Sequence, residues 1–265
     1  MLIQKLDVTK YKRFFAFGCS FTYYRWPTWA DIIGAEVPMF ENWGKGAAGN
    51  QFIFSSVVEA NNKYKFNKDD LVIVSWTSVL REDRYFNGHW LHASNTQREE
   101  VYGKDWMEKF GFEIRGNMIR DYALIDAGQR LLESLDCDWT NFNSIPIVQF
   151  DQEKVAKHFG NEKDALAFYF DYQSLLTEHD FILNYDVIQR YKHIFSSITR
   201  PQFEMVYYKD SPTYHPSPQQ HFTYLDNNLK HNLQNNIDIH KWEKKVVVAD
   251  YKGNFDLDRK FINRL

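Results

Sequence analysis

The chain of 265 residues is poor in cysteine, glycine and proline, with 2 Cys, 12 Gly and 7 Pro. Cys19 and Cys137 cannot form a framework of several disulfides and are not spaced like zinc ligands, so a reducing compartment is expected. Because no linker or internal repeat is present, residues 1–265 are expected to form a single domain.

No hydrophobic run approaches the roughly 20 residues of a membrane-spanning helix, so no membrane span is expected. The start, MLIQKLDVTKYKRFF, lacks a continuous apolar segment ending in small residues, so we expect no secretory signal and a cytoplasmic or otherwise soluble protein. Lys and Arg number 32 and Asp and Glu 35, a net charge of −3. Without the basic excess of nucleic-acid-binding domains, no nucleic-acid partner is expected.

Aromatic residues are abundant, because 22 Phe, 16 Tyr and 8 Trp make up 17% of the chain. Such side chains bury large areas in a core, and they also line clefts that bind sugars. Composition leaves both roles open.

Short apolar segments alternate with helical patterns along the chain. Buried strands are expected at 13–18, 70–76, 144–150 and 203–208, with an added strand at 244–249. Helical spacing of apolar residues predicts helices at 26–33, with Pro27 near the first turn, and at 50–65. This alternation indicates an α/β fold with a mostly parallel sheet that is covered on both faces.

Charged helical patterns extend over residues 98–135 and 153–199. They are too long for ordinary connections between strands. We therefore expect a large helical insertion beside the sheet, roughly over residues 86–199.

A serine follows the first expected strand, in the sequence FGCSFT at residues 17–22. In a tight turn between a strand and a helix, the Ser20 hydroxyl projects at the carboxyl end of the strand, where open α/β sheets bind ligands. The backbone N–H groups that follow favour negative charge there. The alternative is structural: Gly18 makes a turn and Ser20 caps a helix.

A histidine lies near the other end, in the sequence DSPTYHPSPQQH at residues 210–221. Ser217 as N-cap, Pro218 at the first helical position and Gln220 at the third are typical of a helix start. This start would hold His215 ahead of a rigid helix, and an imidazole is a suitable base for a serine nucleophile at neutral pH.

These segments, in this order, resemble the SGNH (GDSL-type) hydrolase family. The sequence GCSFT resembles the first block of the family, Gly-Asp-Ser, with Cys19 in place of Asp, and His215-Pro216 resembles the last block, in which the His is the general base. The sequence NWGKGAAGN at residues 42–50 resembles the second block, a loop that donates a backbone N–H to the oxyanion. Gly46 or Ala47 could be that donor.

The sequence departs from the family at two further motif positions, and the stretch between the third block and Thr199 is longer than the family's plain minimum. The Gly-x-Asn-Asp block is replaced by WTSVLR at residues 76–81, so either the hydroxyl of Thr77 or Ser78 replaces the oxyanion-binding Asn or the oxyanion hole is weaker. The family's Asp, three residues before the His, is replaced by Pro212. Asp210 is the nearest carboxylate; either it orients the His ring, or the enzyme uses a Ser–His dyad.

The resemblance covers about residues 13–84 and 203–226 and implies a three-layer, flavodoxin-like fold and a serine esterase that needs no metal or other cofactor. Ser20 would attack a small acyl ester, such as an O-acetylated carbohydrate, and His215 would pass the proton to the leaving alcohol. The Ser20 and Gly46 or Ala47 amides would hold the oxyanion, with Thr77 as a further donor.

Two alternatives stay open: an O-acyltransferase that acts on a glycan, and a catalytically inactive SGNH-like protein with a binding or structural role.

Other polar residues suggest further roles. The run Arg81-Glu82-Asp83-Arg84 is expected to be solvated, unless Arg81 reaches the crevice and binds an anionic group of the substrate. His89 and His92 lack the carboxylate that would complete a metal site, so a surface or core role is expected.

Overall fold

The structure is a computed structural model that describes residues 5–93, 98–106, 109–110, 114–143, 215–234 and 237–241. The expected strands at 144–150, 203–208 and 244–249 and the helical stretch at 153–199 lie outside these residues. Within the described ranges, every helix is too short or too polar to span a lipid bilayer.

A four-stranded parallel sheet forms the centre of the fold. Its strands, in spatial order, are β3 (Met39–Asn42), β2 (Arg13–Phe17), β4 (Asp70–Trp76) and β7 (Asp138–Asn143). All neighbouring strands in this sheet run parallel, so their carboxyl ends lie at one edge and the loops that follow them converge there. The expected α/β class with a mostly parallel sheet is confirmed.

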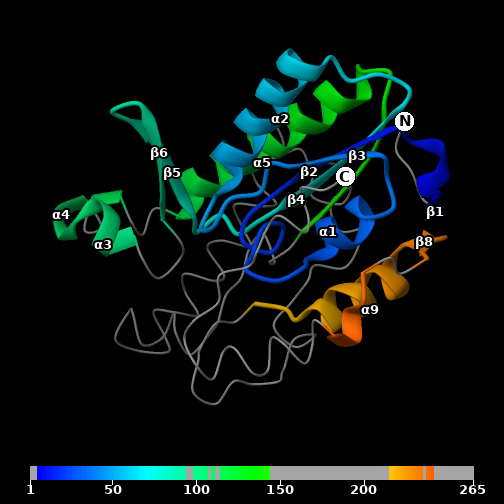
Figure 1. Cartoon of the computed structure of the whole chain (residues 1–265). Helices are drawn as coiled ribbons and strands as arrows, with labels where there is room; N and C mark the ends of the chain where they lie inside the picture. Colours follow the sequence, from blue (N-terminus) through cyan, green and yellow to red (C-terminus); the bar gives the residue numbers. More distant parts are fainter. Residues whose placement is uncertain are drawn as a thin grey trace.

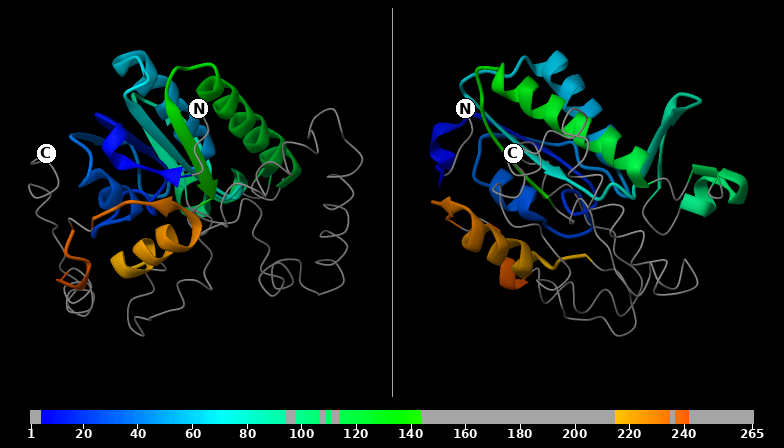
Figure 2. Two further views of the ribbon diagram at one scale, coloured as in Figure 1. Left: turned by 90° about the vertical axis from the view of Figure 1, so that its right-hand side faces the viewer. Right: turned by 180° about the vertical axis from the view of Figure 1, so that it is seen from behind.

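Helices cover both faces of this sheet (Figures 1 and 2). One face carries α2 (Asn50–Tyr64) and α5 (Ile114–Glu133), and the other carries α1 (Trp29–Gly34) and α9 (Pro218–Asn228). Alternate residues of β2 point to opposite faces, so Phe15 packs in the core under α2 and α5, whereas Phe14 packs in the core under α1 and α9.

Smaller elements complete the described residues. Strand β1 (Lys5–Leu6) pairs in parallel with β8 (Lys230–His231), and a 3-10 turn, η1 (Val8–Lys10), follows β1. Two short helices, α3 (Arg98–Tyr102) and α4 (Lys104–Trp106), lie beyond the central sheet near β5 and β6 (Figure 1).

Helix α1 begins later than the sequence pattern predicts. The carboxylate of Asp31 accepts hydrogen bonds from the Thr28 N–H at 2.8 Å and from the Thr28 hydroxyl at 3.1 Å. This cap makes Trp29 the first helical residue, so the helix begins three residues later than the predicted start at Trp26, and Pro27 lies directly before the Thr28 cap.

Helix α9 begins as its sequence predicts. Ser217 Oγ accepts from the Gln220 N–H at 3.4 Å, and Gln220 Oε1 accepts from the Ser217 N–H at 2.8 Å. With Pro218 as the first helical residue, this reciprocal cap fixes the chain entering the helix.

The segment expected to begin a helical insertion forms a β-hairpin instead. Strands β5 (Glu82–Phe86) and β6 (His89–Ala93) pair antiparallel and project from the body of the molecule (Figure 1). Asn87 and Gly88 form the turn with φ values of 48° and 82°. Positive φ at both positions is the signature of the two-residue hairpin turn that Asn-Gly favours.

Residues 114–143 also differ from the expected helical insertion. Helix α5 packs against α2 on the sheet, and β7 pairs with β4 from Leu71 opposite Asp138 to Trp76 opposite Asn143. Residues 138–143 are thus a strand of the central sheet and not part of a helical insertion over 86–199.

Candidate active site

Ser20 lies in the turn that directly follows β2, at the edge where the parallel strands end. The N–H groups of Thr22 and Tyr23 donate to the Cys19 carbonyl at 2.9 and 3.2 Å. A Cβ at Gly18 would overlap with Thr22 Oγ1, so a side chain there would disrupt the turn. No described helix begins at Ser20, so its alternative role as a helix cap is not observed.

The structure brings Ser20 and His215 together, although 195 positions separate them. His215 Nε2 lies 2.8 Å from Ser20 Oγ, a hydrogen-bond distance. Ser20 is 7% exposed and the imidazole is partly buried. A hydroxyl and a base at this distance are the minimal arrangement of an activated nucleophile.

Aromatic side chains from the segment after Ser20 hold the imidazole. The Tyr24 ring stacks on His215 with centroids 3.8 Å apart and an interplanar angle of 9°, and Phe21 lies at 5.3 Å. Trp26 Nε1 donates to the Pro216 carbonyl at 2.6 Å, which ties the His215 backbone to the same segment. Sequence reasoning missed Tyr24; the aromatic density of FTYYRW was the available signal.

The surroundings of His215 favour its neutral form. Burial, together with the positive charges of Arg81 and Arg25, lowers the pKa of His215 to about 3. None of the described residues forms a hydrogen bond with its Nδ1 atom. Asp210, the expected third member of a triad, lies outside the described residues.

The loop after β3, residues 43–49, is fixed to the turn that holds Ser20. The Lys45 N–H donates to the Gly18 carbonyl at 3.1 Å, and Asn42 Nδ2 donates to the Thr22 carbonyl at 2.8 Å. Asn42 Oδ1 also accepts from the Gly44 N–H at 2.9 Å. The Asn that begins this loop therefore links it to the serine turn.

Gly46 and Ala47 lie at the tip of this loop. Ala47 has a left-handed backbone with φ of 61°, and a Cβ at Gly46 would meet no atom within 4 Å. Among the described residues, none accepts a hydrogen bond from either amide. Both N–H groups are therefore open to a ligand.

The side chains of Arg81 and Asp83 hold the peptide group that joins Ala48 to Gly49, at the end of this loop. Arg81 Nη1 donates to the Ala48 carbonyl at 3.0 Å, and both carboxylate oxygens of Asp83 accept from the Gly49 N–H at 2.9 Å. Asp83 also accepts from the Phe52 N–H at 2.9 Å, which caps the start of α2. We call this arrangement the loop clamp.

Thr77 follows β4 at the same edge and is completely buried. Asn50 Nδ2 donates to the Thr77 carbonyl and the Thr77 N–H donates to Asn50 Oδ1, both at 2.9 Å. The peptide groups of Thr77 are thus occupied, and its hydroxyl has no partner among the described residues. The Ser78 hydroxyl instead accepts from the Leu80 N–H at 3.2 Å.

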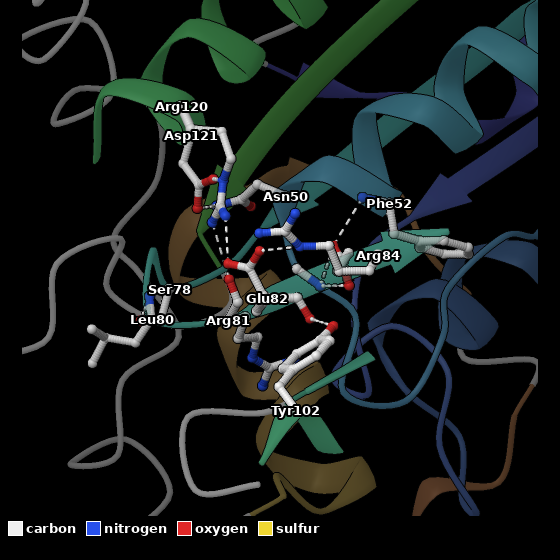
Figure 3. Close-up of polar contacts among 12 residues, drawn as sticks. Asn50, Phe52, Ser78, Leu80, Arg81, Glu82, Arg84, Tyr102, Arg120 and Asp121 are labelled. Carbon is white, nitrogen blue, oxygen red and sulfur yellow. Dashed lines mark hydrogen bonds and ion pairs between the residues drawn. The ribbon is translucent and has the colours of Figure 1, made fainter. Parts of the chain in front are cut away.

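The expectation that residues 81–84 form a solvated run of charges is wrong for the first three residues, whereas Arg84 is exposed. Arg81, Glu82 and Asp83 are 6%, 2% and 1% exposed. Figure 3 shows Glu82 between two cations: its carboxylate pairs with Arg120 at 2.6 Å and with Arg84 at 3.0 Å. Arg120 of α5 and Arg84 of β5 compensate Glu82, and backbone N–H groups of residues 49 and 52 satisfy Asp83; such partners are needed because an unpaired buried charge is unfavourable.

The two histidines of β6 have separate roles. His92 Nδ1 lies 2.8 Å from Asp83 Oδ1 behind the loop clamp, whereas His89 is exposed and its Nδ1 lies 3.2 Å from the Asn87 carbonyl oxygen. In the part of the chain that the structure describes, no group of three or more His, Cys, Asp or Glu side chains is placed to hold a metal ion.

No protein-family model, curated protein or solved structure matches this chain. The chemistry of the site is therefore inferred from its own residues.

Proposed function

We propose that this protein is a serine esterase of the SGNH type with a flavodoxin-like fold, and that it cleaves small acyl esters such as O-acetylated carbohydrates. The observation that carries the proposal is the 2.8 Å hydrogen bond between Ser20 Oγ and His215 Nε2. The position of this pair supports it, because open parallel sheets bind ligands at the carboxyl ends of their strands.

In the proposed reaction, Ser20 Oγ attacks the ester carbonyl carbon and His215 Nε2 takes the hydroxyl proton. The tetrahedral intermediate collapses as His215 returns this proton to the leaving alcohol, and a water molecule then hydrolyses the acyl-enzyme by the same steps. A neutral imidazole is the form that can accept the proton, and the low pKa of His215 keeps it neutral.

The negative charge on the carbonyl oxygen requires hydrogen-bond donors. The open amides of Gly46 and Ala47, together with the Ser20 N–H, are the proposed donors, and the unpaired Thr77 hydroxyl is a further one. Such donors lower the barrier because they are aimed before the charge develops. The loop clamp and Asn50 hold the backbone on either side of this site.

In the proposed catalytic unit, Ser20 and His215 form the reacting pair, and Asp210 is the proposed third residue. Within the described residues, stacking on Tyr24 and the fixed start of α9 hold the imidazole ring. Because these contacts orient His215, they support catalysis by Ser20 and His215 without a large contribution from the Asp210 carboxylate.

The test is hydrolysis of 4-nitrophenyl acetate together with covalent labelling by a fluorophosphonate. Ser20→Ala should abolish labelling, and both Ser20→Ala and His215→Ala should lower kcat by about 10³-fold or more. Ser55→Ala, which changes a serine on α2 that bonds the Gln51 carbonyl, is the matched control and should label normally. Equal rates for wild type and Ser20→Ala, or no labelling of folded wild type, would favour an inactive SGNH-like protein.

The same acyl-enzyme could pass its acyl group to a sugar hydroxyl instead of water, which would make the protein an O-acyltransferase. Product analysis with an added glycan acceptor separates the two outcomes: free acid indicates the esterase, and an acylated glycan indicates the transferase.

A further inference from the structure

Arg81 is a buried cation with no carboxylate partner among the described residues. Its side chain is 6% exposed, and its one hydrogen bond to a described residue joins Nη1 to the Ala48 carbonyl. The Nε atom is buried without a partner in the same part of the chain. A guanidinium has five N–H donors, and within the described part of the chain one hydrogen bond from these donors is present.

The neighbouring carboxylates are occupied elsewhere. Glu82 pairs with Arg84 and Arg120, and Asp83 accepts from two backbone N–H groups and contacts His92. In Figure 3 the Arg81 side chain extends away from Arg120 and Asp121. Glu82 and Asp83 therefore do not compensate the charge of Arg81. An uncompensated charge is unfavourable for a buried group.

Arg81 lies beside the proposed catalytic residues. It holds the last peptide of the loop that carries Gly46 and Ala47. Its positive charge also lowers the pKa of His215. Arg25, the other cation that acts on His215, is exposed and lies over the Tyr24 ring, 5.7 Å from its centroid.

We propose that Arg81 binds a negatively charged group of the substrate, so that the preferred substrates are esters that carry an anionic group close to the scissile bond. This inference rests on the proposed esterase function and names its substrate class. A planar guanidinium pairs well with a carboxylate or a phosphate, and a bound anion would supply the partner that Arg81 lacks. The charge can be on the acyl part or on the alcohol part.

The experiment compares kcat/KM for two matched pairs of esters. The acyl arm uses 4-nitrophenyl succinate, which has a free carboxylate, and its methyl ester, with release of 4-nitrophenol as the readout. The alcohol arm uses 4-acetoxybenzoate and its methyl ester. We expect wild type to prefer the anionic ester in one of the two arms by about 10- to 100-fold, the usual effect of a hydrogen bond to a charged group.

Arg81→Met should reduce this preference to about one, and Arg81→Lys should retain part of it. Arg84→Met, which removes a half-exposed arginine three residues further along the chain on β5, is the matched control and should keep the wild-type preference. A purely structural role of Arg81 would lower hydrolysis of the anionic and neutral esters equally. An unchanged preference in Arg81→Met, or no preference in wild type in either arm, overturns the inference.

A second measurement needs no variant. In wild type, succinate should inhibit hydrolysis of 4-nitrophenyl acetate competitively, whereas the neutral succinamide should not. Equal inhibition by both compounds counts against an anion site. Hydrolysis of neutral esters without any anion preference contradicts this inference alone, whereas failure to hydrolyse any ester contradicts the proposed function itself.

Discussion

The Tyr24 ring lies face to face with the His215 imidazole, with centroids 3.8 Å apart. Tyr24 follows Ser20 by four residues, so a single short segment supplies both the proposed nucleophile and the surface on which the proposed base rests. The ring orientation of His215 thus depends on residues next to Ser20 as well as on the start of α9.

Removal of the Tyr24 ring should lower the rate of ester hydrolysis. Stacked aromatic pairs contribute about 0.5–1.5 kcal/mol beyond their buried area, so Tyr24→Ala should lower kcat by about 2- to 10-fold. Tyr24→Phe keeps the ring and should retain nearly all activity. Steady-state rates with 4-nitrophenyl acetate test this, and an equal loss in both variants would mean that the hydroxyl, not the ring, is required.

The acid limb of the pH–rate profile should lie well below pH 6.5. Burial and two arginines lower the pKa of His215 to about 3, so the base stays neutral as the pH falls through the usual histidine range. Arg25→Gln removes a positive charge, which raises the pKa of His215 and moves the limb to higher pH. Arg130→Gln, at an exposed ion pair on α5, is the control and should leave the limb in place.

Protein stability should fall as the pH drops from about 6.5 toward 3. Burial lowers the pKa of both His215 and His221 to about 3, so these groups stay neutral in the folded protein while the unfolded chain binds protons. Each such group contributes a slope of up to about 1.4 kcal/mol per pH unit in this window, and above pH 6.5 its contribution is constant.

His221→Gln should therefore reduce the slope of unfolding free energy against pH between 6.5 and 3, as measured by urea denaturation. Comparing His221→Gln with wild type cancels the contributions of groups that change the slope in the opposite direction. Asp31 is such a group, because burial raises its pKa to about 6. His89→Gln, at an exposed site on the hairpin, is the control. An unchanged slope in His221→Gln would show that His221 is protonated in the folded protein.

Asn50 should be important for stability because it bonds both peptide groups of Thr77 and the Asp121 carboxylate. Asn50→Ala leaves these buried groups unsatisfied and should destabilise the fold by about 2–4 kcal/mol. Asn62→Ala changes an exposed residue of the same helix and should cost less than about 0.5 kcal/mol. Thermal or urea unfolding of both variants tests this, and equal effects would contradict it.

The parts of the fold that local sequence determines could be predicted. Strand β4 is apolar throughout its middle and is buried over its whole length, so the run itself defines it. The cap of α9 was predictable because Ser217, Pro218 and Gln220 all act within four positions of one another.

The hairpin and its buried charges could not be predicted in the same way. The Asn87-Gly88 turn signal was present in the sequence, but residues 86 onward were assigned to the helical insertion because charged helical patterns follow from residue 98. Burial of Glu82 depends on Arg120, 38 positions further along the chain, and such a partner is not apparent from local pattern.

The candidate site was only partly predictable. Ser20 and His215 were found because each has a characteristic local setting, but only the structure gives the distance between them. The loop clamp was missed because it joins backbone groups of residues 48–49 to side chains of residues 81 and 83 across the fold. Backbone partners leave no signature in the sequence.

At the shared edge of the parallel strands, the proposed site residues come from three separate connections. The chain after β2 contributes the hydroxyl, the chain after β3 contributes open amides, and the chain after β4 contributes Thr77, while the apolar interior lies on either side of the sheet behind them. Because Cys19, Phe21, Ala48 and Val79 of these connections belong to that interior, a change in a connection also affects the packing of the core.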